Sequence, residues 1–279
     1  MLSHILESWL YSSHMDMPMT LLRLRRSVGS YFARKNVPGS EWLEFWNELQ
    51  PKDNGHELIR IGNARDGGYL LPNDLLNLGI CISPGVSSMM DFELQLAESF
   101  SIPSLLMDAS ILPPDSMHPL LTFRSTFVGP YSHDKFTTLP SICLELQNQG
   151  KQPPWLLQMD IEGFEYSTLL ATPSDLLKEF RILVIEFHSV QDWIHTSYFQ
   201  NIIQPLFAGL KHHFDIVHVH PNNCDGTFRF KGRIYPRALE MTFHNKNRRK
   251  SIGNLKSRNL PHQLDLDNSD KLPSIKLKF

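Results

Sequence analysis

The sequence predicts an α/β fold: a Rossmann-like, mostly parallel twisted sheet with helices on both faces. Segments typical of strands alternate with segments typical of helices from about residue 79 onward. The segment 181–188 is rich in β-branched and apolar residues, as a central strand buried on both faces would be. Polar or acidic residues follow several of the strands, where ligands bind in open parallel sheets. Together, these observations favour a doubly wound sheet.

The strands and helices are predicted from apolar runs bounded by turn residues and from helical spacing of apolar residues. The first two strands flank an Asp-Gly-Gly turn at residues 66–68 and predict a hairpin. The predicted strands cover residues 56–62, 69–72, 79–83, 104–108, 123–128, 155–160, 181–188, 214–220 and 239–243. The predicted helices cover residues 91–98, 139–149, 164–170 and 198–210.

Three regions are expected along the chain. Residues 1–50 have an amphipathic, partly basic helical pattern and predict an N-terminal helical extension that packs on the domain. Residues 51–244 hold the alternating strands and helices and form the Rossmann-like domain. Residues 245–279 are polar, with a basic start, and predict a flexible tail.

The composition is that of an ordinary globular protein and excludes some classes. Of the 279 residues, 41% are hydrophobic and 20% charged, enough for one sizeable domain with extensions. The net charge of −2 argues against a protein that mainly binds nucleic acid. Cys81, Cys143 and Cys224 lack metal-ligand spacing and predict free thiols in a reducing compartment. With neither a signal peptide nor a transmembrane segment expected, a cytoplasmic location is predicted.

The candidate site lies at the ends of four predicted strands. It consists of a glycine after the first of these strands and polar or acidic residues after the others: Gly85, Asp108, Asp160, Glu162, Glu186 and His188. A glycine after the first core strand allows close approach of the backbone to a ligand. Asp108 lies 23 residues later, about the spacing at which an acidic residue binds a ribose diol. One glycine in place of the three of a dinucleotide loop disfavours a pyrophosphate cofactor such as NAD and favours a nucleoside cofactor.

Five segments resemble the FkbM-like (Methyltransferase 21-type) family. The similarity extends over roughly residues 57–244, with residues 158–165 (Gln-Met-Asp-Ile-Glu-Gly-Phe-Glu) the most specific part. The other segments are 60–69, 83–93 with Met107 and Asp108, 185–188 and 218–223. The resemblance implies a class I methyltransferase fold, S-adenosylmethionine as cofactor, and methyl transfer to an oxygen of a sugar, glycan or other small metabolite.

The resemblance also implies roles for single residues. Ser83, Gly85 and Val86 would line the methionine part of the cofactor. Phe92 and Glu93 would help to close that pocket. Asp108 would hold the ribose, Asp160 would face the methyl-transfer centre, and Glu162 would orient Asp160 or help bind a metal.

Methyl transfer to a hydroxyl requires a base or a metal that lowers the hydroxyl pKa. The candidate bases are Asp160, Glu186 and His188. These three side chains and Glu162 are also candidate ligands of Mg²⁺, because hard cations prefer oxygen ligands. His218 and His220, two apart on one strand, share a face and are further candidates for that site, although paired histidines on a strand are more often structural or solvated.

Alternative functions remain open at this point. The serine-rich loop after Gly85 favours a catalytically degenerate Rossmann-like domain that serves as a binding or scaffold module. The missing glycines disfavour an oxidoreductase. A nucleic-acid methyltransferase depends on the basic N-terminal segment and tail, whereas a small-molecule or glycan acceptor is the expected partner. The sequence leaves the oligomeric state open.

Overall fold

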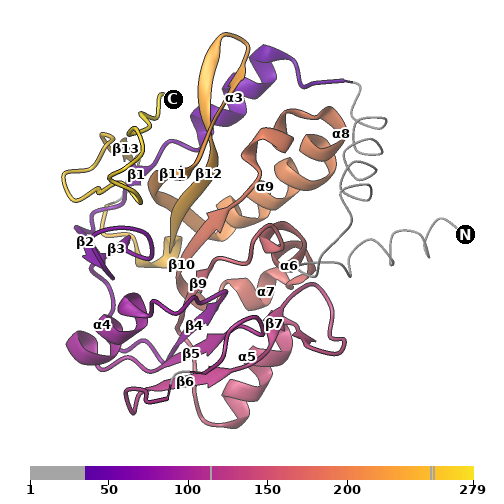
Figure 1. Cartoon of the computed structure of the whole chain (residues 1–279). Helices are drawn as coiled ribbons and strands as arrows, with labels where there is room; N and C mark the ends of the chain where they lie inside the picture. The colour runs from indigo at the N-terminus through magenta and orange to yellow at the C-terminus, as the bar shows by residue number, and fades with distance from the viewer. Residues whose placement is uncertain (1–34, 114, 252, 254) are drawn as a thin grey trace, which may run out of the picture.

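The structure, a computed structural model, describes residues 35–279 except 114, 252 and 254 (Figure 1). Most of the predicted N-terminal helical extension therefore lies outside the described residues. The described part of that extension contains helix α3 (Gly39–Glu48), which buries Trp42, Phe45 and Trp46 against the domain.

A seven-stranded sheet forms the centre of the molecule, in the order β11-β12-β10-β9-β4-β5-β6. Its strands are β4 (Cys81–Pro84), β5 (Ser104–Met107), β6 (Leu121–Arg124), β9 (Trp155–Met159), β10 (Phe180–Phe187), β11 (Phe214–Phe230) and β12 (Arg233–Asn245). The strands from β10 to β6 run parallel, while β12 and β11 are antiparallel at one edge. The predicted α/β fold with a mostly parallel sheet is therefore confirmed.

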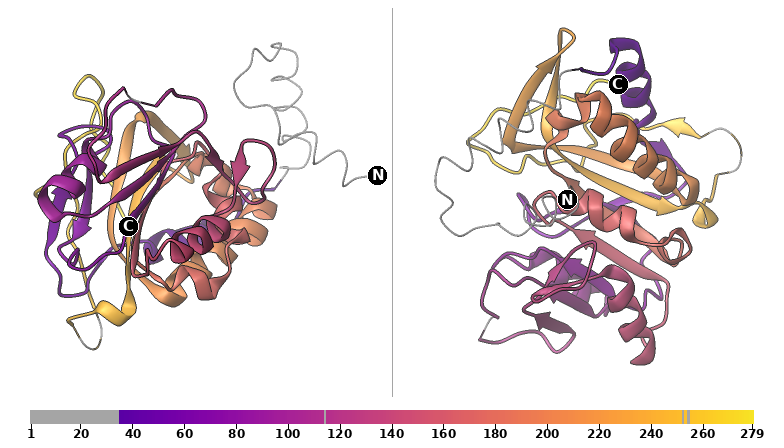
Figure 2. Two further views of the ribbon diagram at one scale, coloured as in Figure 1. Left: turned by 90° about the horizontal axis from the view of Figure 1, so that it is seen from below. Right: turned by 90° about the vertical axis from the view of Figure 1, so that its right-hand side faces the viewer.

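Alternate side chains of the central strands enter two separate cores. Leu157 and Leu183 belong to one core, whereas the neighbouring Leu156 and Ile182 belong to the other. Helix α4 (Asp91–Phe100) packs into the second core. Helices α5 (Leu139–Asn148), α6 (Glu165–Ala171) and α9 (Gln204–His213) pack into the first. Figure 2 shows α9 lying across the long β11–β12 hairpin.

The remaining elements are short. The helical ones are α7 (Ser174–Leu177), η1 (Val190–Ile194), α8 (Thr196–Tyr198), the π-helical η2 (Phe199–Ile203) and η3 (Lys246–Arg248). The strands are β1 (Lys52–Asp53), β2 (Leu58–Ile61), β3 (Tyr69–Pro72), β7 (Phe127–Val128), β8 (Phe136–Thr137) and β13 (Lys256–Ser257). Strands β2 and β3 form the predicted hairpin.

The C-terminal segment packs on the domain, which differs from the flexible tail suggested for residues 245–279 by their polar composition. Strand β13 pairs with β1. The indole N–H of Trp46 donates to the Lys278 carbonyl oxygen (3.0 Å), and the Phe279 ring stacks on Trp46. Asn268 is buried. Asn268 donates to Glu240 and Asp66 of the domain, a pairing that composition does not reveal.

All three cysteines are free thiols, and only Cys224 is exposed. Among the described residues, none of the helices has the length and apolar character needed to cross a membrane.

Candidate functional site

A cavity of about 440 Å³ lies at the carboxyl ends of β4, β5 and β9. Here the strand order reverses, because β5 and β9 flank β4 on opposite sides. The structure brings six of the seven predicted cofactor residues to its wall: Gly85, Val86, Phe92, Glu93, Asp108 and Asp160. Sequence reasoning missed the aromatic part of the wall, which Phe127, Phe136 and Phe164 supply from short strands and a loop.

Ser83, the seventh predicted residue, lies fully buried beside the cavity. Its hydroxyl oxygen contacts Glu93 Oε1 and lies 2.6 Å from Gln158 Oε1. Burial raises the pKa of the Glu93 carboxyl. A protonated Glu93 can donate to the Ser83 oxygen, so that the Ser83 hydroxyl donates to Gln158. The Ser83–Glu93 pair thus joins β4 to helix α4 and supports the wall from inside.

Gly85 is required by the close approach of two loops. Its φ is +88°, and a Cβ at this position would lie 1.5 Å from the carbonyl oxygen of Asp160. No other residue type fits, because a β-carbon cannot come that close to backbone. The sequence predicted that Gly85 allows close approach to a ligand. Its nearest neighbour in the structure is instead the chain around Asp160.

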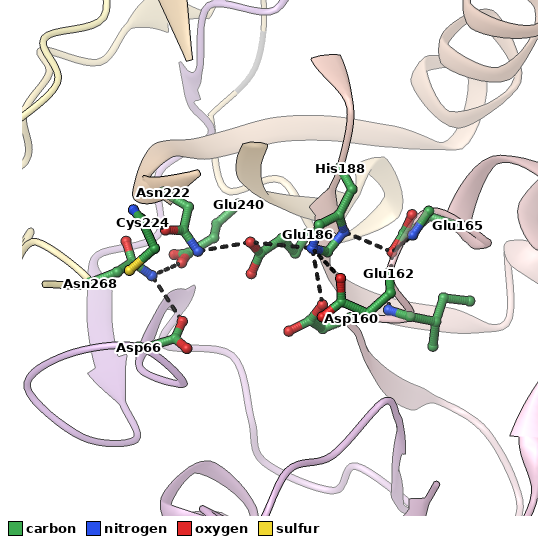
Figure 3. Close-up of polar contacts among 12 residues, drawn as sticks. Asp66, Asp160, Glu162, Glu165, Glu186, His188, Asn222, Cys224, Glu240 and Asn268 are labelled. Carbon is green, nitrogen blue, oxygen red and sulfur yellow. Dashed lines mark hydrogen bonds and ion pairs between the residues drawn. The ribbon is translucent and has the colours of Figure 1, made fainter. Parts of the chain in front are cut away.

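Asp160 and His188 form the centre of an acidic group beside the cavity (Figure 3). His188 Nε2 lies 3.6 Å from Asp160 Oδ1 and 3.8 Å from Glu186 Oε1. Glu162 Oε2 is also 3.6 Å from that nitrogen. The other ring nitrogen, Nδ1, lies 3.1 Å from Glu165 Oε1. The structure therefore brings together all three predicted catalytic residues and adds Glu165.

Glu165 also holds the backbone of the Met-Asp-Ile-Glu-Gly segment in place. Its Oε1 accepts hydrogen bonds from the backbone N–H groups of Ile161 (3.0 Å) and Gly163 (3.2 Å). Glu162 between them has a φ of +55°, an unfavourable value for a residue with a side chain. A fully buried carboxylate thus fixes a strained turn that directs Asp160 to the cavity.

The electrostatics of this group differ from those of isolated side chains. The pKa of Asp160 is raised to about 7 as the net result of burial, which raises it, the His188 charge, which lowers it, and the charges of Glu165 and Glu162, which raise it. Burial would lower the pKa of His188, but the hydrogen bond and charge of Glu165, with Asp160 and Glu186, raise it to about 10. Burial and the charges of Asp160 and Glu240 raise the pKa of Glu186. His188 is therefore protonated at neutral pH, whereas Asp160 titrates near it.

A second acidic group continues across the sheet from Glu186. Glu240 on β12 is directly opposite Glu186 on β10, and both are buried. Carboxylate oxygens of these two residues and Asp66 lie within 4.8 Å of one another. Asn222 donates to Glu186 (2.8 Å), and Asn268 donates to Glu240 and Asp66 (Figure 3). Sequence reasoning missed Glu240, although a glutamate in an otherwise apolar strand was a usable signal.

The predicted Mg²⁺ site does not fit these residues well. Of the four predicted ligands, only Asp160 and His188 offer atoms in one set within 4.8 Å, with Glu165 as the third member. The centre of that set is an imidazole engaged with Glu165, whereas Mg²⁺ prefers an all-oxygen shell. His218 and His220 lie elsewhere, beside Asp265, so the interpretation of them as candidates for this site is wrong.

Part of the chain that forms this site is similar to a known protein family. The model described as the methyltransferase FkbM domain matches residues 109–216. No curated protein and no solved structure matches the chain. The matched residues include β9 and β10 with the Asp160 and His188 segments at their ends. The resemblance to the FkbM-like family predicted from the sequence is therefore confirmed for residues 109–216, which match the methyltransferase FkbM domain.

Proposed function

We propose that the protein is an S-adenosylmethionine-dependent methyltransferase that methylates a hydroxyl of a sugar, glycan or other small metabolite. One observation carries this proposal: the cavity at the reversal of strand order has Asp108 on one wall and Asp160, with its acidic group, on another. The matched FkbM domain supports the methyltransferase activity itself.

A class I, Rossmann-like fold for residues 51–244 is part of the proposal. Counted from β4 as the first strand, the sheet has the order 3-2-1-4-5, with the β11–β12 hairpin added at one edge. The order 3-2-1-4-5 is that of doubly wound nucleotide-binding folds, which bind ligands at the reversal point. The cavity lies at that point.

The cavity residues fit S-adenosylmethionine. A volume of about 440 Å³ is within the usual range for small-molecule sites. Asp108 Oδ1 accepts from the backbone N–H and hydroxyl of Ser110, which orients the carboxylate and leaves Oδ2 available for ribose hydroxyls. Gly85 and Val86 would hold the methionine part, with Phe92 beside it. When bound, the cofactor supplies an electrophilic methyl group.

Asp160 is the best candidate for the base. An acceptor hydroxyl must lose its proton as its oxygen becomes bonded to the methyl carbon, and bases act best with a pKa near the working pH. The pKa of Asp160, about 7, meets that condition. His188, with a pKa of about 10, is protonated and acts instead as a positioning residue beside Asp160. Glu186 is buried 3.8 Å from His188 Nε2, behind the cavity wall, and in this proposal it acts through His188.

Isothermal titration calorimetry with S-adenosylmethionine and with S-adenosylhomocysteine tests the cofactor. We expect one molecule bound per chain and at least about tenfold weaker binding for Asp108→Ala, because each lost hydrogen bond to a charged group costs about 1.5–3 kcal/mol. Asp115→Ala is the matched control, because Asp115 is exposed and outside the cavity wall.

Two results would overturn the cofactor assignment. One is no heat of binding with either ligand; the other is unchanged affinity in Asp108→Ala. The serine at position 87, exposed on the cavity wall, favours the alternative of a catalytically degenerate binding module. Absence of binding in folded protein would support that alternative.

A further inference from the structure

We propose that His218, His220 and Asp265 form a binding site for a divalent transition metal, specifically Zn²⁺. The site joins strand β11 to the C-terminal segment and is separate from the proposed methyl-transfer centre. It does not depend on the proposed function.

The three side chains converge although they are far apart in sequence. His218 and His220 alternate on β11, so both imidazoles are on the same face of the sheet. Asp265 Oδ1 lies 2.9 Å from His218 Nε2 and 3.7 Å from His220 Nδ1. One ligand atom from each residue lies within 4.8 Å of the other two.

His218 is a buried group that lacks a suitable partner. Its exposed fraction is 3%, and neither ring nitrogen makes a hydrogen bond of acceptable geometry among the described residues. Nε2 is close to Asp265 Oδ1, but distance alone does not make a hydrogen bond. Buried polar groups without partners cost about 1–3 kcal/mol each, so this unpaired nitrogen beside the Asp265 carboxylate indicates a missing ligand.

The spacing of the ligand atoms suits a small metal ion. Tetrahedral coordination with bonds of about 2.0–2.2 Å separates ligand atoms by about 3.3 Å. The observed separations of 2.9 and 3.7 Å lie on either side of that value. Two imidazoles and a carboxylate are a ligand set used for zinc, and three protein ligands leave one coordination position open.

Asp265 and His220 each have a side-chain atom available to bind a metal ion. The second oxygen of Asp265, Oδ2, accepts from the backbone N–H of His262 (2.6 Å), which fixes the carboxylate and leaves Oδ1 for the metal. His220 Nε2 is buried and makes no hydrogen bond within the described part of the chain.

A neighbouring histidine cluster shows what a site without a metal looks like. His244 Nδ1 contacts Asn54 (2.9 Å), and His244 Nε2 contacts Asp74 (3.1 Å). Asp74 is further paired with Arg248. Both ring nitrogens of His244 have partners and the charge is balanced, so a cation has no place there. The His218 group has no arginine or lysine paired with Asp265 among the described residues.

Zinc content and affinity test the site directly. The protein is prepared without a polyhistidine tag, stripped with a chelator and titrated with Zn²⁺ alone, and its bound metal is measured by mass spectrometry. We expect one Zn²⁺ per chain in the wild type and at least about 100-fold weaker binding in Asp265→Asn and His220→Gln, because even partners of metal ligands change affinity by 10–100-fold. His212→Gln, an exposed histidine, and Asp160→Asn are expected to bind as the wild type does.

Retention of zinc in both ligand variants, or its loss in Asp160→Asn alone, would overturn the assignment. So would the absence of stoichiometric binding by the wild type. Circular dichroism shows whether each variant is folded. X-ray absorption of zinc-loaded wild type needs no variant: we expect two imidazole ligands, and a shell of sulfur or of oxygen alone contradicts the site.

Discussion

The buried carboxylate of Asp74 and the partly buried carboxylate of Asp160 are in opposite electrostatic surroundings. Asp74 accepts two hydrogen bonds from Arg248 (2.7 Å each) and one from His244, with Arg181 3.7 Å away. Asp160 lies among Glu162, Glu165 and Glu186, with His188 as the cation of the group.

The pKa values follow from this difference. Burial alone would raise the pKa of Asp74, but Arg248, His244 and Arg181 hold it well below its usual value. The pKa of Asp160 is raised to about 7. Burial raises it, His188 lowers it, and the charges of two glutamates offset part of that lowering. A fully paired carboxylate stabilises a fold, whereas an excess of buried acid costs stability and leaves a group that can exchange a proton near neutral pH.

The largest effect is expected from removing the titrating carboxylate. Asp160→Asn keeps the shape of the side chain but cannot accept a proton, so kcat should fall by about 10²–10⁴-fold. Stability at pH 8 should stay the same or rise, because the variant removes a buried negative charge from an acidic group. Methyl transfer is followed by release of S-adenosylhomocysteine and stability by denaturant unfolding.

Asp175→Asn is the matched control for that variant, because Asp175 pairs with Lys178 on the surface. It should leave both quantities unchanged. Full methyl transfer by Asp160→Asn would remove this residue from the mechanism.

The reverse result is expected for the paired carboxylate. Asp74→Asn leaves the buried Arg181 and the half-exposed Arg248 without their counter-charge, so the free energy of unfolding should fall by about 3 kcal/mol. Affinity for S-adenosylmethionine should be unchanged in the folded fraction. Urea unfolding and calorimetry measure the two quantities.

The pH dependence has a definite sign. The folded pKa of Asp74 is lowered, so its stabilisation is complete above its unfolded value of about 3.9 and is lost as the pH falls through the folded value. The difference between wild type and Asp74→Asn should therefore shrink below pH 4. A constant difference down to pH 2 would mean that the lost shape of the network, and not its charge, matters.

The two surroundings also show what a sequence can predict. The alternating strands and the positions of Asp160, Glu186 and His188 at strand ends follow from local pattern, since parallel strands place their carboxyl ends at one edge. Local pattern does not give long-range partners. The sequence motif assigns no role to Glu165, yet this side chain fixes the turn of the motif through Ile161 and Gly163.

The C-terminal segment is a clearer example of a structure that the local sequence pattern does not predict. Its polar composition suggested a flexible tail, because composition measures how much apolar area a segment can bury. Asn268 is buried through hydrogen bonds to Asp66 and Glu240, which lie far from it in sequence. Asp265 likewise lies 2.9 Å from His218 on β11, far from it in sequence. Such pairings depend on tertiary structure and leave no periodic signal.

A smaller effect concerns the pH profile of the acidic group. If Asp160 is the base, kcat/KM should rise with pH through about 7, where its proton is lost. His188→Gln removes the positive charge that lowers the pKa of Asp160, so the rising limb should move to higher pH. A profile measured from pH 5 to pH 9 shows the shift. An unchanged midpoint with lower kcat would instead mean that His188 acts only through packing.

The smallest effect is expected at Glu240, which belongs to the second acidic group and forms no ion pair with an arginine among the described residues. Burial raises its pKa to about 8, so the folded protein holds Glu240 protonated at pH 5, and the isosteric Glu240→Gln should be within about 1 kcal/mol of wild type there. Because a raised folded pKa means stability that is lost as the pH rises toward that value, the wild type should lose more stability than the variant between pH 5 and pH 9. At pH 9 the variant should be more stable by about 1–2 kcal/mol.

Denaturant unfolding at pH 5 and pH 9 measures this difference in stability, with the exposed Glu57→Gln as control. If Glu240→Gln lost the same stability at pH 5 and at pH 9, Glu240 would be ionised and paired, as Asp74 is. Glu240 would then not share the electrostatic surroundings of Asp160 and Glu186.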